Sequence, residues 1–288
     1  MIPSTFDYHA PKTLKSALRL LNENEDAKIM AGGHSLIPLM KFRFASPAVV
    51  IDLGKVPGLS RIKISDGVIQ IGALTTHHAI ESNARLKRVC AVLPETASEI
   101  GDAQVRNRGT IGGSVVHADP AADWPATMVA LDAEFEITGT SGTRTVSAPD
   151  FFVDMMTTSI EEGEILSQVR IPAPPPNTGS AYAKMHQSAS GFAIVGVAAQ
   201  VTLDGSGNIS AASVGITGVA PKPYRATAVE SALVGNAPDE ATISSAAANA
   251  AEGAEDFNED HHASGEYRKH LATVYAKRAL TAAVGRAS

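Results

Sequence analysis

Two paired glycines, each at the end of an apolar stretch, place the strongest constraint on the fold of this chain. The first pair lies in Met30-Ala31-Gly32-Gly33-His34-Ser35-Leu36, and the second in Gly109-Thr110-Ile111-Gly112-Gly113-Ser114. Because glycine tolerates positive φ and has no Cβ, successive backbone N–H groups at such a pair can converge on a phosphate. Ser35 and Thr110 would add hydroxyl donors. The two loops predict a ligand with two linked phosphates, although either pair alone is also typical of a tight turn.

Neither segment matches the two commonest phosphate-binding motifs. No Gly-x-Gly-x-x-Gly follows a predicted strand with an acidic residue about twenty positions later, as the Rossmann fingerprint requires. No Gly-Lys-Ser or Gly-Lys-Thr follows either pair, as a P-loop requires. The residues therefore favour a dinucleotide site in some other fold.

The hydrophobic pattern indicates an α+β protein with a strand-rich first part. It predicts helices at 11–21, 75–80, 90–100 and 123–131, and strands at 27–30, 49–53, 62–64, 68–71, 133–138, 143–148 and 164–171. The proline-rich run 172–179 is expected to be a stiff linker that cannot pair inside a sheet. Strands at 193–203 and 209–217, with helices at 224–234, 238–252 and 265–284, then predict a small antiparallel sheet covered by helices.

Charge and cysteine content exclude several classes of function. The net charge of −6 and the lack of a basic run interleaved with aromatics argue against a nucleic-acid partner. No apolar stretch approaches the roughly 18 to 20 residues that span a bilayer, and no signal-peptide pattern opens the chain, so we expect a cytoplasmic protein. Cys90 is the only cysteine and is expected to be a structural thiol in an amphipathic helix. A single thiolate cannot hold an iron–sulfur cluster, which takes about four.

The histidines do not indicate a metal site. His77 and His78 are adjacent and would point to different faces of a helix, and His261 and His262 lie in an acidic segment that we expect to be exposed. Neither pair has the spacing of metal ligands on one face, so no protein-bound metal is predicted. No Gly-x-Ser-x-Gly motif marks a hydrolytic nucleophile.

Segments 31–38 and 104–113 resemble the two FAD pyrophosphate loops of the medium subunit of molybdenum hydroxylases, the xanthine dehydrogenase family. The likeness is closest to medium subunits of aerobic carbon monoxide dehydrogenases, and it extends from residues 1–8 to residues 266–280. The resemblance implies a two-lobed FAD-binding fold of the vanillyl-alcohol oxidase or PCMH type in residues 1–175, with lobes at about 1–55 and 56–175. It also implies a CO dehydrogenase flavoprotein C-terminal-like domain of antiparallel sheet and helices in residues 176–288.

The resemblance further implies which residues bind FAD. Asp119 and Asp123 follow the second loop, where relatives place an aspartate on the ribose or adenine side, and Asp123 is the better match. Asp123 is equally typical of a helix N-cap. Leu166 would pack on the flavin and Lys184 would stabilise negative charge at its polar edge. Phe192 would cover the flavin face, or else start a strand as a core residue. The predicted FAD-binding residues are Ala31, Gly32, Gly33, His34, Ser35, Leu36, Ile100, Thr110, Ile111, Gly112, Gly113, Ser114, Asp119, Asp123, Leu166, Lys184 and Phe192.

Two residues near these sites depart from the pattern of the family. Ser114 replaces an asparagine that is common there, and Gly191 replaces an acidic residue of close relatives. Cofactor binding is still expected, but a particular electron acceptor cannot be carried over. His34 and His117, each beside a glycine loop, are expected to be flavin neighbours without a covalent link.

The resemblance implies an electron-transfer subunit with no catalytic residue of its own. A large partner subunit with a molybdopterin-type molybdenum cofactor would oxidise the substrate, and a small partner with [2Fe–2S] clusters would pass electrons singly. FAD on this chain would then collect two electrons for quinone, NAD or another acceptor. The family implies a dimer of heterotrimers and is compatible with peripheral membrane association of the complex.

Two other functions remain open from the sequence. One is a self-sufficient FAD-dependent oxidase or reductase, which would need an acid or base over the flavin. The other is a non-catalytic nucleotide-binding assembly protein, which would bind nucleotide without a reducible flavin. The substrate of the complex is not indicated, and carbon monoxide, purines, nicotinate-like heterocycles and aldehydes all fit the family.

Overall fold

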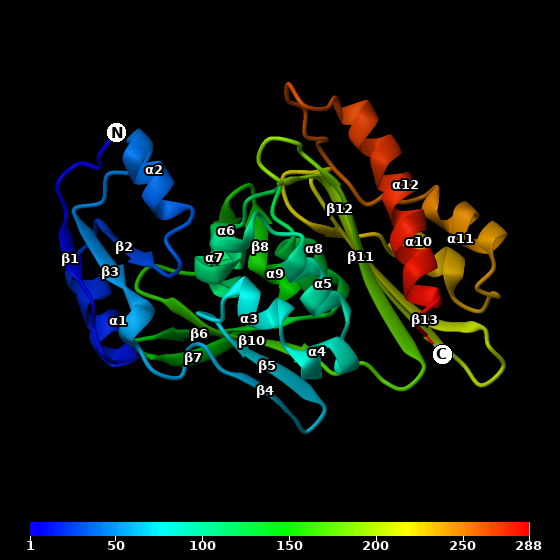
Figure 1. Cartoon of the computed structure of the whole chain (residues 1–288), viewed down its shortest axis with the longest axis horizontal. Coiled ribbons are helices and arrows are strands. Elements are labelled where there is room, and N and C mark those ends of the chain that lie inside the picture. Colours follow the sequence, from blue (N-terminus) through cyan, green and yellow to red (C-terminus); the bar gives the residue numbers. More distant parts are fainter. Residues whose placement is uncertain (288) are drawn as a thin grey trace.

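The computed structural model describes residues 1–287 and arranges them in three parts side by side (Figure 1). Each part contains its own sheet and its own cluster of buried apolar side chains. We call them the N-terminal lobe (7–55), the central lobe (62–172) and the C-terminal part (178–284). The α+β class expected from the sequence is confirmed.

The N-terminal lobe is a parallel three-stranded sheet, ordered β1-β3-β2, with two short helices. The α1 helix begins after Thr13, whose hydroxyl accepts a hydrogen bond from the Ser16 N–H at 3.1 Å. Ala17 and Leu18 of this helix are buried in the cluster that contains Ile51. The elements are β1 (Asp7–His9), α1 (Leu14–Glu23), β2 (Ala27–Met30), α2 (Leu36–Phe42), β3 (Val49–Asp52) and a 3₁₀ turn (Leu53–Lys55). Strand β2 therefore delivers the chain directly into the first glycine pair.

The central lobe is an antiparallel five-stranded sheet, ordered β4-β5-β10-β6-β7, with a layer of short helices (Figure 1). Every residue of helix α8 is buried, because the helix packs on β12 and β13 of the C-terminal part. The elements are β4 (Ile62–Ser65), β5 (Val68–Gly72), α3 (His77–Glu81), α4 (Ala84–Val89), α5 (Val92–Ser98), α6 (Ala103–Arg108), α7 (Ile111–His117), α8 (Trp124–Ala130), β6 (Glu134–Gly139), β7 (Gly142–Ser147), α9 (Ala148–Phe151), β8 (Phe152–Asp154), β9 (Thr157–Thr158) and β10 (Ile165–Pro172).

The C-terminal part is an antiparallel sheet, ordered β11-β12-β13-β14, with helices over one face (Figure 1). The long helix α12 packs along β11 and β12, where Leu271, Tyr275 and Leu280 join the buried cluster. The elements are β11 (Thr178–His186), β12 (Ala193–Leu203), β13 (Ile209–Thr217), β14 (Tyr224–Arg225), α10 (Thr227–Leu233), α11 (Glu240–Ala247) and α12 (Gly265–Val284). No helix within residues 1–287 combines the length and apolar character that crossing a membrane requires.

The expected linker at 172–179 is wrong at both ends. Pro172 is the last residue of β10 and pairs with Val68 of β5. The pairing of β10 with β6 ends at Arg170, so Pro172, which has no N–H, is not needed as a donor to β6. Thr178 and Gly179 already belong to β11. Only residues 173–177 connect the two sheets, so the C-terminal part is closely attached to the central lobe.

Cys90 lies between α4 and α5 and not inside a helix, which corrects the amphipathic helix expected there. The side chain is buried, and burial raises the pKa of its thiol to about 12. A thiol held in this neutral form is a poor nucleophile, in keeping with a structural role.

Candidate functional site

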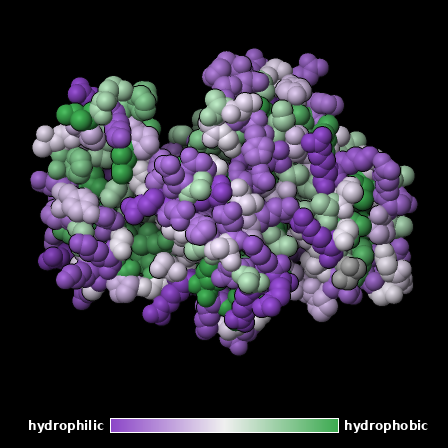
Figure 2. All heavy atoms as spheres, viewed as in Figure 1, coloured by the Kyte–Doolittle hydropathy of each residue, from purple (hydrophilic) through white to green (hydrophobic). Residues whose placement is uncertain are grey.

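A cavity of about 510 Å³ lies between the N-terminal lobe and the central lobe, and we call it the interlobe cavity. Segment 31–36 lines it from the N-terminal lobe, and α7, Ile160, residues 164–166 and Phe192 line it from the other side. Figure 2 shows hydrophobic atoms over α2 and along the recess between the two lobes. Its volume lies within the roughly 300 to 1,000 Å³ of small-molecule and cofactor sites.

The first glycine pair forms the backbone cradle that the sequence predicts. Gly33 has a φ of +75°, which glycine adopts at little cost. The backbone N–H groups of residues 32–36 donate to no acceptor within residues 1–287. The Nδ1 atom of His34 lies 3.1 Å from the Gly32 carbonyl oxygen. A run of free amides at a positive-φ turn is an anion-binding geometry.

The second glycine pair does not form a loop, which corrects the sequence prediction. Gly112 and Gly113 lie in the first turn of α7, with φ outside the positive region. The Gly112 N–H donates to the Ala73 carbonyl at 2.9 Å, and a Cβ on Gly112 would lie 2.5 Å from the Ala73 Cβ. This pair therefore provides close packing against the end of β5 and not a second nest of free amides.

Thr110 caps α7 and faces the same cavity. Its Oγ1 accepts a hydrogen bond from the Gly113 N–H at 3.1 Å, which leaves the hydroxyl proton to donate to a ligand. The two glycine segments touch each other, because a Cβ on Gly32 would lie 2.1 Å from the Arg108 carbonyl oxygen. The arrangement brings a cradle of amides from the N-terminal lobe and a hydroxyl from the central lobe to the same cavity.

His77 is a cavity residue that the sequence reasoning did not assign to the site. Its Nδ1 accepts a hydrogen bond from Trp124 Nε1 at 3.1 Å, and its backbone N–H donates to the Gly109 carbonyl at 3.0 Å. Burial, together with the neighbouring positive charges of His34 and Arg106, lowers the pKa of His77 to about 4. The imidazole is therefore neutral at pH 7 and fixes the start of the second glycine segment.

The lowered pKa of His77 makes stability depend on pH. The unfolded chain binds this proton with a pKa of about 6.5 and the folded chain with about 4, so the unfolded state holds more protons between these values. The contribution of His77 to the free energy of unfolding is thus fully present above about pH 6.5. It decreases by roughly 3 kcal/mol as the pH is lowered to about 4. A His77→Asn variant, which keeps an acceptor for Trp124, should lose about that much less over this range in chemical denaturation at each pH. Equal losses in both proteins would contradict the assignment.

Asp123 and Lys184 lie behind the cavity wall and bind each other. Lys184 Nζ is 2.8 Å from Asp123 Oδ1 and donates to the Glu99 carbonyl at 2.7 Å. The Tyr182 hydroxyl donates to Asp123 Oδ1 at 2.7 Å. Burial raises the pKa of Asp123, and the hydrogen bonds from Lys184 and Tyr182 partly offset this. Asp123 makes no N-cap hydrogen bond to α8, so the helix-cap alternative is wrong. Its contact with FAD stays a prediction.

The other predicted residues divide clearly between the cavity and the core. Ile111 is fully buried and lies outside the lining, as do Asp123 and Lys184. Phe192 is 46% exposed at the mouth, which excludes the alternative of a core residue. The predicted residues that line the interlobe cavity are Ala31, Gly32, Gly33, His34, Ser35, Leu36, Ile100, Thr110, Gly112, Gly113, Ser114, Asp119, Leu166 and Phe192.

Glu164 is a second cavity residue that the sequence reasoning missed. Its carboxylate accepts two hydrogen bonds from Arg144, at 2.8 and 2.6 Å. These hydrogen bonds lower the pKa of Glu164 and keep it charged. The alternation that predicts strand 164–171 gives no sign that its first residue faces a cavity, so only the fold reveals this position.

Comparison with known proteins places the whole chain among flavin-binding subunits. Residues 4–174 match the family described as the FAD binding domain in molybdopterin dehydrogenase, and residues 180–283 match the CO dehydrogenase flavoprotein C-terminal domain. The chain is 40% identical to the carbon monoxide dehydrogenase medium chain of Afipia carboxidovorans, covering 100% of this chain and 99% of the relative. It is 34% identical to the glyceraldehyde dehydrogenase medium chain of Sulfolobus acidocaldarius, covering 97% and 99%.

Solved structures agree with the sequence comparison. The carbon monoxide dehydrogenase of Hydrogenophaga pseudoflava that lacks the Mo-pyranopterin moiety superimposes with a TM-score of 0.95 at 40% identity, covering 99% of both chains. The two-lobed fold and the C-terminal part expected from the sequence are thereby confirmed.

Proposed function

This chain belongs to the family of FAD-binding medium subunits of molybdenum hydroxylases, and from that premise we propose that it is the electron-transfer subunit of such a complex. It would take electrons from a partner subunit with [2Fe–2S] clusters and pass them to quinone, NAD or another acceptor. The observation that carries this proposal is the interlobe cavity, which is lined by free backbone amides of one lobe and by the Thr110 hydroxyl of the other.

The residues present fit FAD. The free N–H groups of residues 32–36 suit a pyrophosphate, and the missing Cβ of Gly32 leaves the space through which the two lobes approach. Thr110 and Ser114 would add hydroxyl donors, and Leu166 and Phe192 offer apolar surface to a flavin ring. FAD, when bound, supplies a redox group that exchanges electrons either singly or in pairs. The protein's own contribution is to bind and orient it.

The partner subunits follow from what this chain lacks. Its single cysteine is buried, so the iron–sulfur clusters of the proposed electron path would belong to a small partner subunit. As in the family, the molybdenum cofactor would belong to a large partner subunit. We propose a dimer of such heterotrimers in the cytoplasm. The substrate would be oxidised on the large subunit, so this chain's similarity to carbon monoxide and glyceraldehyde dehydrogenase chains does not select a substrate.

We also propose a division of the chain into an FAD-binding domain at 1–175, with lobes at about 1–55 and 56–175, and a C-terminal domain at 176–288. The separate sheets and buried clusters of the described residues support these boundaries. The short connection at 173–177 supports the second of them.

The visible spectrum of the purified chain tests the cofactor assignment. We expect flavin absorption bands that disappear with dithionite, and release of FAD on denaturation, identified by chromatography. A chain with no flavin bands after incubation with excess FAD would contradict the assignment. Bound nucleotide without a reducible flavin would favour the assembly protein instead.

A further inference from the structure

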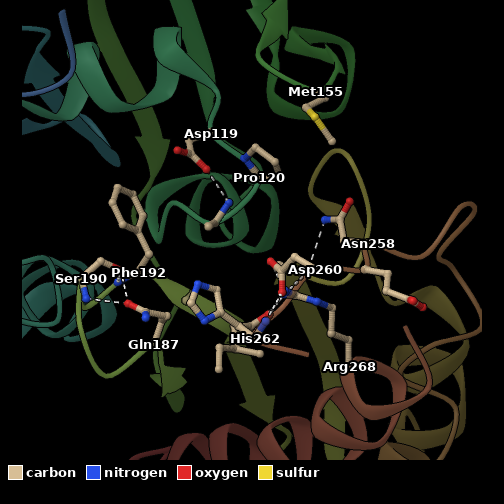
Figure 3. Close-up of a pocket in the computed structure, with 15 residues that line it drawn as sticks. Asp119, Pro120, Met155, Gln187, Ser190, Phe192, Asn258, Asp260, His262 and Arg268 are labelled. Carbon is tan, nitrogen blue, oxygen red and sulfur yellow. Dashed lines mark hydrogen bonds and ion pairs between the residues drawn. The ribbon is translucent and has the colours of Figure 1, made fainter. Parts of the chain in front are cut away.

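A second cavity, of about 360 Å³, lies between the central lobe and the C-terminal part (Figure 3). Its polar side chains are largely paired with protein atoms. Arg268 donates to Asp260 at 2.8 Å, and Asn258 donates to the Ala220 carbonyl at 2.7 Å. The larger interlobe cavity differs, because the imidazole of His77, which lines it, carries a donor that no protein atom uses.

The imidazole of His77 has a defined tautomer. Its Nδ1 atom lies 3.1 Å from Nε1 of Trp124, and an indole nitrogen can only donate a hydrogen bond. Nδ1 is therefore the acceptor, so the proton of the neutral ring lies on Nε2. Burial and the positive charges of His34 and Arg106 lower the pKa of His77 to about 4. The ring is thus a neutral Nε2–H donor at pH 7.

This Nε2–H group is buried but can be reached from the cavity. His77 is 4% exposed, and its Nε2 has no hydrogen-bond partner within residues 1–287. An unpaired polar group is costly in a protein interior. Nε2 is not sealed off, however, since it keeps accessible surface and His77 lines the interlobe cavity. A molecule in the cavity could therefore supply the missing acceptor.

Gly109 leaves the space beside this donor open. Its φ of −58° and ψ of 142° are values that other residues adopt readily, so the backbone conformation does not require glycine. The two atoms nearest to a Cβ on Gly109 would be Nε2 and Cδ2 of His77, at 2.8 and 2.9 Å. The absence of a side chain therefore keeps Nε2 uncovered, and Gly109 itself lines the cavity.

The donor lies next to the amides of the first glycine segment. A Cβ on Gly32 would lie 2.9 Å from the Gly109 Cα, so Gly32 lies against Gly109 and Gly109 against His77. Thr110, whose hydroxyl is free to donate, follows Gly109 directly. The free amides of residues 32–36, the Thr110 hydroxyl and the His77 imidazole thus gather in one part of the cavity. Several neighbouring donors suit the oxygens of linked phosphates.

We propose that His77 is an FAD-binding residue whose Nε2–H group donates a hydrogen bond to an oxygen of the pyrophosphate. The inference rests on the proposed function, because this oxygen belongs to bound FAD. The hydrogen bond from Trp124 already fixes the orientation of the ring. Binding therefore requires little further ordering of the side chain, which favours affinity.

Two substitutions at His77 separate the roles of the two ring nitrogens. Asparagine keeps an acceptor near the position of Nδ1 and removes the Nε2 donor, whereas glutamine keeps a donor near Nε2 and removes the acceptor for Trp124. His77→Asn should bind FAD about 10-fold more weakly than the wild type, or weaker still. His77→Gln should bind FAD nearly as the wild type does but unfold at a lower urea concentration. Calorimetric titration of FAD and of ADP, which also contains a pyrophosphate, into the flavin-free chain measures affinity.

His78→Asn is the matched control. It is the same substitution at the next residue, where the side chain is 53% exposed and does not line the cavity, so its FAD affinity should equal that of the wild type. Gly109→Ala tests the donor without changing His77, because the new Cβ would cover Nε2, and it should also weaken binding about 10-fold. Combining Gly109→Ala with His77→Asn should add little, since both remove the same hydrogen bond.

NMR of the imidazole groups gives a direct readout. The Nε2–H proton of His77, identified by its loss in His77→Asn, should shift downfield when FAD or ADP binds. An unmoved signal would overturn the inference, as would equal FAD affinity in His77→Asn and His78→Asn. Equal weakening by His77→Asn and His77→Gln would also overturn it, because the loss would then not depend on the donor.

The outcomes separate this inference from the proposed function. A wild-type chain that binds ADP but not FAD would contradict the proposed function, and the ADP affinities of the same variants would still decide whether His77 binds a pyrophosphate. A chain that binds neither nucleotide would contradict both.

Discussion

A Gly32→Ala variant is expected to bind FAD about 100-fold more weakly than the wild type, which corresponds to roughly 2.7 kcal/mol. The added Cβ would lie 2.1 Å from the Arg108 carbonyl oxygen and 2.9 Å from the Gly109 Cα. Both are backbone atoms that cannot rotate away, so the first glycine segment must move from the second. The amides of residues 32–36 would then no longer face the Thr110 hydroxyl at the distance set by the folded chain. Titration of FAD into the flavin-free variant measures the loss.

Gly205→Ala is the matched control for this substitution. Gly205 lies in a surface turn outside the positive-φ region, and a Cβ there meets no atom within 4 Å. Its FAD affinity should equal that of the wild type. If Gly32→Ala does not fold, Gly33→Ala gives the second measurement, because its φ of +75° strains any side chain but its nearest contact is the flexible end of Ile37. If both Gly32→Ala and Gly33→Ala bound FAD as tightly as the wild type, the proposal that the amides of residues 32–36 bind FAD would be refuted.

Asp123→Ala is expected to reduce the free energy of unfolding by about 3 to 5 kcal/mol. The substitution leaves the Lys184 ammonium charged and without its carboxylate, although the Lys184 side chain is fully buried. It also removes the acceptor of the Tyr182 hydroxyl. Because a buried unpaired charge is far more costly than an exposed one, the effect should exceed that of most single substitutions. Urea denaturation of the flavin-free chain measures it.

A double variant and an exposed ion pair complete this test. Asp123→Leu combined with Lys184→Met removes both charges and should recover most of the loss, because no buried charge remains. Glu240→Ala breaks the ion pair with Lys277, in which the glutamate side chain is 85% exposed, and should cost about 1 kcal/mol or less. If Asp123→Ala lowered the free energy of unfolding by no more than Glu240→Ala does, the buried pair of Asp123 and Lys184 would contribute no more than the exposed pair of Glu240 and Lys277.

Local patterns in the sequence predict much of the fold. The bounds of β2, β12, β13 and α12 are those that the hydrophobic periodicity indicates, because each element buries a regular set of apolar side chains in one of the three clusters. The first glycine segment is equally local, since a positive φ and free amides need only a few consecutive residues. Most of the predicted FAD-binding residues therefore line one cavity.

The errors arise where distant residues decide the structure. Glycine disfavours a helix, yet Gly112 lies in α7, at a position where Ala73, far away in the chain, leaves no room for a Cβ. Asp123 is typical of a helix cap in the sequence, but in the fold its carboxylate binds Lys184 of β11, 61 residues away. The sequence predicts that Pro172 belongs to a linker. In the structure it is the last residue of β10, where a sheet can contain a proline. No local pattern contains these contacts.

The interlobe cavity lies between two lobes with separate hydrophobic clusters, so a nucleotide bound there would link the two lobes. Occupancy by a ligand at a thousandfold excess over its Kd would add about 4 kcal/mol to folding stability. A chain made when flavin is scarce would lack this contribution, and its N-terminal lobe would open more often and become accessible to proteases. The supply of flavin in the cell would thus influence the lifetime of the protein as well as its activity.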